Sequence, residues 1–175
     1  MSLSRYQQMR DFSRTPEPRG RVRPSEESLR FVVQRHQARS LHFDFRLEID
    51  GVLKSWAVPK GPSDDPAEKR LAVQTEDHPI EYAGFEGTIP AGEYGAGATK
   101  IWDEGRWVPE TEPLAAYRRG RLTFELKGRR LKGRWTLIRM GNAQTRKKDL
   151  WLLVKRAAPA AKSRPPARGL RPPRG

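Results

Sequence analysis

The 175-residue chain contains no cysteine, only three histidines and no long run of apolar residues. Without cysteine it forms no disulfide bond and offers no thiolate to a metal ion, which fits a reducing compartment. No segment approaches the ~20 consecutive apolar residues of a membrane-spanning helix, and the N-terminal segment lacks the apolar core of a secretory signal. These absences exclude disulfide-stabilised and helical membrane proteins. We expect a cytoplasmic protein with no membrane partner.

Acidic residues are scarce relative to basic ones. Lys and Arg together number 35 and Asp and Glu 21, so the formal net charge is +14 at pH 7. In a chain without an amphipathic membrane helix, an excess of this size favours nucleic acid as the polyanionic partner. Such binding would weaken as salt rises, because each neutralised phosphate releases counterions. Charge alone does not separate a specific binder from a generally adhesive basic protein.

Short alternating runs of polar and apolar residues fill the middle of the chain, a pattern typical of strands with one buried face. Asp50 and Gly51 separate two such runs as a tight hairpin turn. About nine short strands with one or two short helices predict an all-β fold: a crescent-shaped, partly open β-barrel of antiparallel strands. We expect a polar face of His, Asp and Arg side chains to lie inside this barrel. We expect most tryptophans to fill its core rather than stack on bases, namely Trp102, Trp107, Trp135 and Trp151.

Composition divides the chain into three parts. Residues 1–28 lose their periodicity in a stretch rich in Pro, Arg and Glu, and we predict an N-terminal arm. Residues 29–156 contain the strands and form the β-barrel domain. Residues 157–175 are rich in Pro, Ala and Arg and contain no acidic residue, a composition that predicts a disordered basic tail.

The segment from Leu41 to Ile49 is the most informative of these strands. Alternate side chains of a strand share a face, and the polar face here carries His42, Asp44 and Arg46. A charged strand face is most often only hydrated, but His36 lies just upstream, so two of the three histidines fall here. Two imidazoles and one carboxylate form a three-ligand set that leaves coordination positions open for water or substrate. The pattern indicates a metal site without indicating which metal.

The third histidine, His78, lies at the start of a predicted short helix, with Tyr82 four residues later on the same face. A histidine at this position often only caps the helix, but the helix dipole also favours an anion there. A phosphate oxygen could therefore lie between His78, Tyr82 and Arg46. Lys60, at the end of a strand, could reach the same ligand, although a solvated lysine is the more common outcome.

Two long motifs, RHQARSLHFDFRLEIDGVLKSWAVPKGPS and DHPIEYAGFEGTIPAGEYGAGATKIWDEG, resemble the 3'-phosphoesterase domain of bacterial DNA ligase D, a multidomain end-joining enzyme. The resemblance begins near Arg10 and extends to about Arg156. It implies a crescent-shaped β-barrel that acts in DNA repair by non-homologous end joining. The implied enzyme is a metal-dependent nuclease and phosphatase, which removes 3'-terminal phosphates and trims a 3'-terminal ribonucleotide to leave a 3'-hydroxyl.

The resemblance also implies cofactor, partners and residue roles. The metal would be Mn²⁺ or a similar divalent ion, and the substrate a DNA primer-template or duplex with a recessed 3' end. A DNA ligase or polymerase of end joining is a second candidate partner. The implied roles are metal ligation for His36, His42 and Asp44, catalysis for Arg46, His78, Tyr82, Asp11 and Glu17, and phosphate or DNA binding for Arg10, Lys60 and Arg70.

Two other classes of protein share parts of this pattern. The net charge and the tryptophans also suit a non-catalytic β-barrel that binds nucleic acid without a metal. Two histidines and one carboxylate also describe the iron site of a non-haem oxygenase. Metal content separates the first alternative from a phosphoesterase. Activity without oxygen separates the second.

Overall fold

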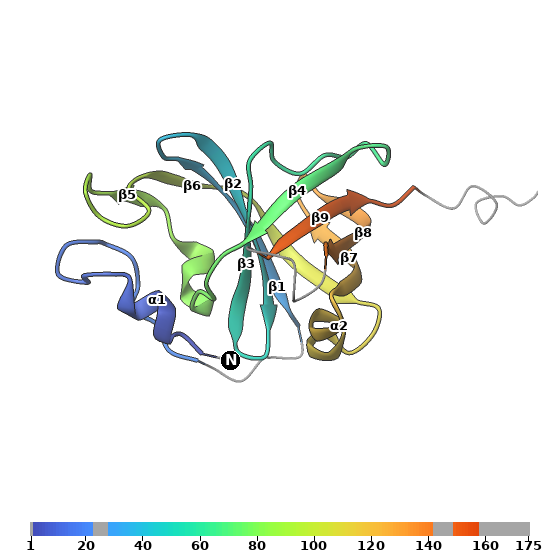
Figure 1. Cartoon of the computed structure of the whole chain (residues 1–175), viewed down its shortest axis with the longest axis horizontal. Helices are drawn as coiled ribbons and strands as arrows, with labels where there is room; N and C mark the ends of the chain where they lie inside the picture. The colour runs from blue at the N-terminus through green and yellow to red at the C-terminus, as the bar shows by residue number, and fades with distance from the viewer. Residues whose placement is uncertain (1, 23–27, 142–148, 158–175) are drawn as a thin grey trace, which may run out of the picture.

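The computed structural model describes residues 2–22, 28–141 and 149–157, and its helices and strands are labelled in Figure 1. The elements in chain order are α1 (Ser4–Gln8), β1 (Arg30–Gln37), β2 (Leu41–Ile49), β3 (Val52–Val58), β4 (Lys69–Gln74), η1 (Ile80–Gly84), β5 (Gly87–Ile89), β6 (Gly97–Pro109), α2 (Pro113–Arg119), β7 (Arg121–Gly128), β8 (Lys132–Arg139) and β9 (Leu150–Lys155).

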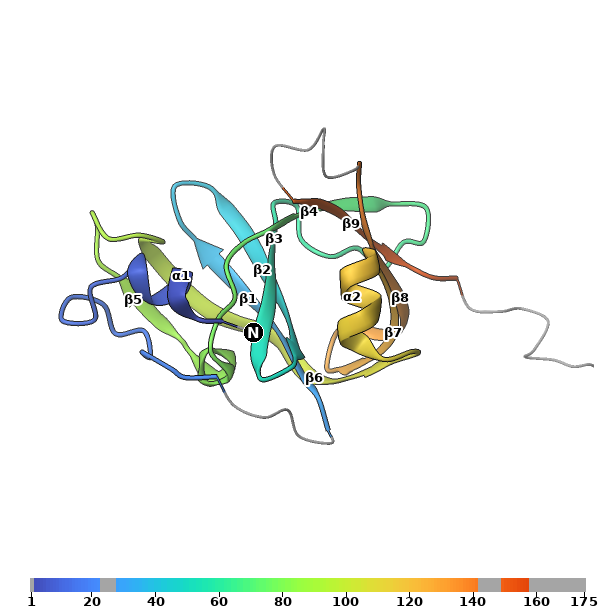
Figure 2. The same ribbon diagram turned by 60° about the horizontal axis from the view of Figure 1, so that its bottom comes forward.

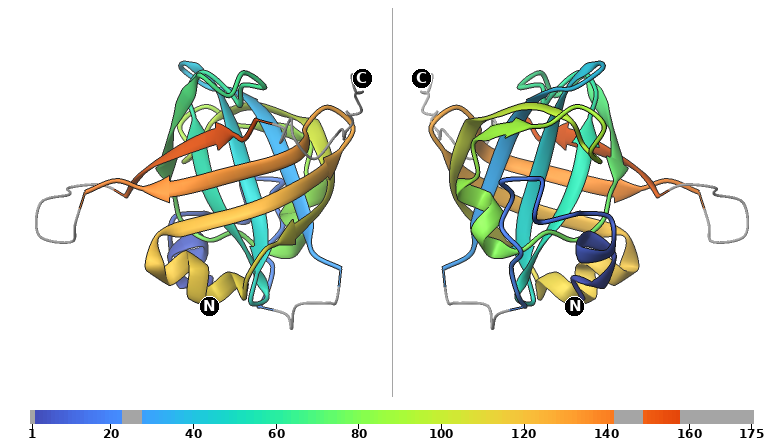
Figure 3. Two further views of the ribbon diagram at one scale, coloured as in Figure 1. Left: turned by 90° about the vertical axis from the view of Figure 1, so that its right-hand side faces the viewer. Right: turned by 90° about the vertical axis from the view of Figure 1, so that its left-hand side faces the viewer.

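The strands form an antiparallel barrel, which confirms the predicted all-β fold (Figure 3). Around the ring the order is β1, β2, β3, β4, β9, β8, β7 and β6, and pairing of β6 with β1 closes it. The short strand β5 pairs with the first part of β6 outside this ring. Only two residue pairs join β3 to β4, so the ring is closed but has one sparsely bonded seam.

The β2–β3 hairpin turns where the sequence predicts it. Asp50 and Gly51 have φ angles of 52° and 86°, and a two-residue turn of this left-handed kind matches the twist of the flanking strands. Ile49 therefore pairs directly with Val52. The turn sets the register that places the polar side chains of β2 beside β3.

The apolar face of β2 fills the barrel, so the expectation of a polar interior is wrong. Phe45 and Leu47 are fully buried in the main core, and alternation then places Asp44 and Arg46 on the outer wall. A barrel of this size has an interior just wide enough for side chains, and charges there would lose hydration without gaining partners. The buried tryptophans of this core are Trp56, Trp107, Trp135 and Trp151, while the partly buried Trp102 packs against it.

A second apolar cluster covers the outer wall and shelters the polar face of β2. It is built by α1, η1, β5 and the outward side chains of β1 and β3. The elements α1 and β5 lie on the same side of the barrel (Figure 1). Tyr6 of α1 is fully buried there and donates a hydrogen bond to the carbonyl of Pro18. Residues 2–22 therefore pack against the barrel wall. The main members of the cluster are Leu3, Tyr6, Val32, Leu53, Tyr82, Phe85 and Ile89.

Helix α2 was not predicted from the sequence. The Glu112 side chain accepts hydrogen bonds from the backbone N–H groups of Leu114 and Ala115, and Gly120 ends the helix with φ 83°. Both are ordinary helix-end features that a search for strands passes over. The helix lies on the side of the barrel away from α1 (Figure 2), where Tyr117 stacks on Trp151.

The predicted division into arm, barrel and tail stays a prediction, and apart from Ala157 the tail lies outside the described residues. Within the described residues, no helix combines the length and apolar character needed to cross a membrane.

Candidate functional site

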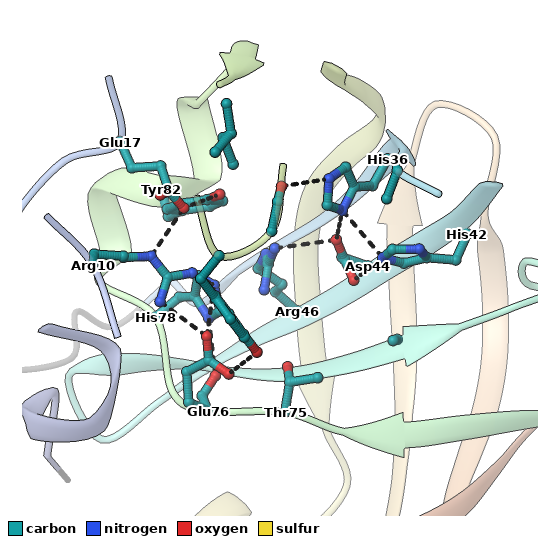
Figure 4. A pocket seen from close by; sticks show the side chains of 15 residues that line it. Arg10, Glu17, His36, His42, Asp44, Arg46, Thr75, Glu76, His78 and Tyr82 are labelled. Atoms are coloured by element: carbon teal, nitrogen blue, oxygen red, sulfur yellow. Dashed lines mark hydrogen bonds and ion pairs between the residues drawn. The ribbon is translucent and has the colours of Figure 1, made fainter. Parts of the chain in front are cut away.

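A cavity of about 260 Å³ opens on the outer wall of the barrel, between strands β1 to β3 and the second apolar cluster (Figure 4). Its walls bring together segments that are far apart in the sequence: the arm, the β1–β2 hairpin, the loop after β4, η1 and the loop after β5. The lining residues are Arg10, Glu17, His36, Ala38, His42, Asp44, Arg46, Ala57, Thr75, Glu76, His78, Tyr82, Ile89, Tyr94 and Gly95.

His36, His42 and Asp44 converge at one end of the cavity. His36 of β1 pairs directly with His42 of β2, so both imidazoles leave the same face of the sheet. The Nδ1 atom of His36 lies 3.2 Å from Nε2 of His42 and 3.6 Å from the Asp44 carboxylate, and His42 Nε2 lies 3.2 Å from that carboxylate. Three ligands about 2.1 Å from one ion would show separations of this size. The donor set fits a divalent cation.

Neighbouring carbonyl groups orient both imidazoles. His36 Nε2 lies 2.9 Å from the Gly95 carbonyl and His42 Nδ1 lies 3.4 Å from the Ser40 carbonyl. A carbonyl only accepts, so the facing nitrogen carries the proton and the other nitrogen presents its lone pair to the triad. Hydrogen bonds of this kind hold metal-binding histidines in one tautomer.

The charge state of the triad also suits a cation. Burial would raise the pKa of the Asp44 carboxyl, but the Arg46 guanidinium, together with the two histidines when they are protonated, holds it well below its usual range. The hydrogen bond to Asp44 raises the pKa of His42 above its ordinary value. Asp44 is therefore ionised at neutral pH and can act as an anionic ligand.

Arg46 is buried in the middle of the cavity, between the triad and His78 (Figure 4). Its Nε donates a 2.7 Å hydrogen bond to the side-chain oxygen of Gln34, and its Nη2 lies 3.5 Å from Asp44. The guanidinium also lies over the Tyr82 ring, 4.8 Å from its centre. These contacts fix the plane of the guanidinium and direct it toward the space beside the triad. A planar fork in this position can bind two phosphate oxygens at once.

His78 is buried opposite the triad and is neutral in the free protein. Its backbone N–H and carbonyl both bond to the backbone of Leu53, and this pair of hydrogen bonds fixes His78 beside β3. Its Nδ1 lies 2.9 Å from the Glu76 carbonyl, so Nδ1 carries the proton, and Nε2 lies 3.4 Å from Nη2 of Arg10. Burial and the guanidinium groups of Arg46 and Arg10 lower the pKa of His78 well below its usual value. In the free protein, Nε2 therefore presents a lone pair to the cavity.

The burial of neutral His78 should make the free energy of unfolding fall in acid. Because the pKa of His78 is lower in the folded than in the unfolded state, the unfolded chain takes up a proton first as the pH falls below about 6.5. Stability is then lost by up to about 1.4 kcal/mol per pH unit. We expect His78→Gln to flatten this dependence between pH 6.5 and 5, measured by denaturant unfolding in chelator. His42→Gln should act above this window, because the stability that the raised pKa of His42 provides is complete below about pH 6.5 and is lost as the pH rises through the folded-state pKa. An unchanged slope in His78→Gln between pH 6.5 and 5 would contradict the assignment.

The arm contributes a second polar network. The Tyr82 hydroxyl donates a 2.7 Å hydrogen bond to Glu17, and the Nε of Arg10 lies 3.0 Å from the same carboxylate oxygen. Arg10 Nη1 also lies 3.0 Å from Glu76. Burial raises the pKa of the Tyr82 hydroxyl well above its usual value, so the phenol stays protonated and donates. The arm thus completes one wall of the cavity.

The remaining predicted site residues do not line the cavity. Asp11 is exposed, and its carboxylate accepts hydrogen bonds from the backbone and side chain of Ser13. Arg70 lies 3.0 Å from Glu68 and donates to the carbonyl of Lys60, which is itself exposed. The roles expected for Asp11, Lys60 and Arg70 stay predictions.

Sequence reasoning passed over Gln34, which accepts the hydrogen bond from Arg46, and the polar lining residues Thr75, Glu76 and Tyr94. Gln34 lies two residues before His36 on the same strand face, so strand alternation alone could have included it. Glu76 and Tyr94 lie in loops, where no periodicity shows which side chain turns inward. Glu76 meets Arg10 across 66 positions of sequence, a contact that only the folded chain makes.

The sequence of this chain is similar to one protein family and to several curated proteins. The family model described as "DNA Ligase D 3'-phosphoesterase domain" matches residues 34–139. The chain is 55% identical over 156 residues to the multifunctional non-homologous end joining protein LigD of Pseudomonas aeruginosa, a match that covers 87% of this chain and 18% of the relative. The LigD proteins of Mycobacterium tuberculosis and Mycolicibacterium smegmatis are each 48% identical, over 86% of this chain and 19% and 20% of their own lengths. The chain therefore spans about a fifth of the length of these curated relatives.

Proposed function

This chain belongs to the DNA ligase D 3'-phosphoesterase family, and we propose that it heals the 3' ends of broken DNA with the help of a divalent metal ion, preferably Mn²⁺. It removes a 3'-terminal phosphate and trims a 3'-terminal ribonucleotide, so that a 3'-hydroxyl remains for end joining. The observation that carries the proposal is one cavity in which a possible metal triad, Arg46 and His78 face one another.

His36, His42 and Asp44 would hold the ion. When bound, a divalent ion polarises a phosphate oxygen and lowers the pKa of a coordinated water. Two nitrogens and one oxygen also suit zinc or iron, so the preference for Mn²⁺ rests on the family resemblance. All three residues line the cavity, and three protein ligands would leave further coordination positions for substrate and water.

Arg46 orients and neutralises the phosphate. Hydrolysis of a phosphate ester depends mainly on positioning and on stabilising the charge that spreads over the transferred group. The guanidinium is held by Gln34 and the Tyr82 ring before substrate binds, so little reorganisation is needed when the charge develops. In the complex it donates two parallel hydrogen bonds to phosphate oxygens.

His78 is proposed to handle the proton of the leaving oxygen. Burial and two guanidinium groups keep it neutral in the free protein, and a phosphate dianion would compensate the guanidinium charge and favour uptake of a proton by Nε2. The proton then passes to the 3'-oxygen as the ester bond breaks. Tyr82 and Glu17 keep Arg10 in place beside this histidine.

The predicted residues outside the cavity are proposed to guide the rest of the DNA. Arg70 donates to the backbone carbonyl of Lys60, so the two residues are neighbours on the surface, and contacts of both cations with the phosphate backbone would add salt-dependent affinity. Asp11 belongs to the same arm as Arg10 and Glu17, and we propose that it supports activity by holding the turn at Ser13.

The direct test uses a primer-template with a recessed 3'-phosphate, and a second one with a single terminal ribonucleotide. Incubated with the chain and Mn²⁺, both should yield a 3'-hydroxyl that a polymerase extends, and chelator should stop the reaction. Activity should persist without oxygen, which a non-haem oxygenase would not allow. Binding of the DNA without any change of its 3' end, by protein with no metal on elemental analysis, would favour the non-catalytic alternative.

A further inference from the structure

Tyr94 lies at the mouth of the cavity. It lines the cavity, yet 46% of its surface is exposed. Its hydroxyl lies 3.3 Å from Glu76, and the Arg10 guanidinium lies over its ring, 5.2 Å from the centre. One face of the ring therefore covers Arg10. The residue nevertheless keeps nearly half of its surface in contact with solvent.

The loop that carries this ring is anchored on both sides. Glu93 lies 3.0 Å from Arg14 of the arm, and the Gly95 carbonyl faces Nε2 of the proposed metal ligand His36 at 2.9 Å. A backbone hydrogen bond from Ala96 to Glu93 closes a turn around Tyr94. The ring thus has a defined position relative to the metal triad before any ligand arrives.

The loop that leads to the ring borders open space at one point: a Cβ atom built on Gly92, two residues earlier, would meet no atom within 4 Å. A terminal phosphate joins its base through a single sugar, so a phosphate held deep in the cavity leaves its base near the mouth. An aromatic face in that place can stack on a base at little cost in conformational entropy.

We propose that Tyr94 is the stacking platform for the 3'-terminal base of the DNA strand, an inference that rests on the proposed phosphoesterase function. Every base has a flat aromatic face, so stacking binds the end without regard to its sequence. This tolerance suits an enzyme that must accept breaks of any sequence. Tyr94 is then a substrate-binding residue that sets the affinity for a nucleoside end and takes no part in the chemical step.

The test compares Tyr94→Ala with the unchanged protein on two substrates that differ only in the terminal base. KM and kcat are measured for release of the 3'-phosphate from a duplex with an ordinary terminal nucleotide and from one with an abasic terminal residue. Tyr94→Ala should raise KM about ten-fold on the ordinary end with little change in kcat, a size typical of base stacking. On the abasic end the variant and the unchanged protein should be equal, because there is no base to stack.

Two further variants separate stacking from other roles. Tyr94→Phe keeps the ring and loses the contact with Glu76, and it should bind like the unchanged protein. Val108→Ala alters a side chain of similar exposure, 44%, that does not line the cavity, and it should change nothing. An equal loss by Tyr94→Ala on both ends would show that the residue acts through Arg10, and no loss on either end would also overturn the proposal.

A measurement of DNA binding in chelator tests the role of Tyr94 separately from the proposed phosphoesterase activity. The Kd of a 3'-phosphate oligonucleotide is measured by competition, with ordinary and abasic ends, for the same proteins. A ten-fold weakening confined to Tyr94→Ala and the ordinary end supports stacking even if no phosphate is released. Release of phosphate with equal Kd values for all proteins would instead retain the function and refute the role of Tyr94.

Discussion

Replacement of His42 by alanine should abolish metal binding and phosphate release together while the domain stays folded. Loss of a partner that only orients a metal ligand already costs about 10–100-fold, so loss of a ligand itself should exceed that range. His42 is the least buried member of the triad, which limits the cost to folding. Metal content after dialysis and turnover on a 3'-phosphate end measure the two effects.

A thermal assay gives a readout of His42 that does not depend on activity. Ligand that binds only the folded state stabilises it by about 2.7 kcal/mol at a hundred times its Kd. Mn²⁺ should therefore raise the Tm of the unchanged protein and not that of His42→Ala. Gln37→Ala, an exposed change at the end of strand β1 beside His36, should keep the full shift. An identical shift in the His42 variant would remove this residue from the ligand set.

Replacement of Arg46 by alanine should lower turnover about 10²–10³-fold and leave the metal in place. This is the usual cost of removing one preorganised donor to developing charge. Arg46→Lys should recover little, since an ammonium cannot form the bidentate fork or keep the bond to Gln34. Turnover is measured at saturating DNA, with metal content determined on the same sample.

The controls for Arg46 address charge and folding. Arg134→Ala removes a guanidinium that pairs with Glu110 on the surface, where ion pairs contribute roughly 0–1 kcal/mol, and turnover should not change. Removal of Arg46 also leaves buried Gln34 and Asp44 with one partner fewer, so thermal unfolding must show that the variant is folded. Normal turnover in folded Arg46→Ala would exclude the proposed phosphate contact.

The polar face of β2 could be predicted because it depends on local geometry. Side chains two apart on a strand share a face whatever surrounds them, so Asp44 and Arg46 were certain to be neighbours once the strand formed. A tight turn at residues 38–40 then brings His36 opposite His42. Gln34 obeys the same rule, but an amide alone does not indicate a site.

Whether that face points into the barrel could not be predicted. Alternation separates two faces without saying which one is inside, and in β2 every residue from Asp44 onward is buried. The choice depends on volume, since aromatic and aliphatic side chains from eight strands fill the interior. The charged face is buried only because the arm, η1 and β5 cover it.

The chain's order of residues by itself determined an all-β fold, a hairpin at Asp50 and Gly51, and a strand face whose side chains we propose bind a metal ion and phosphate. Tertiary structure decided which other side chains complete that face. Arg10, Glu76 and Tyr94 come from the arm and two loops, and their positions depend on packing across the barrel wall. The period and spacing of residues carry no information about contacts between segments far apart in the sequence. Such contacts form only when the whole chain has buried its apolar surface.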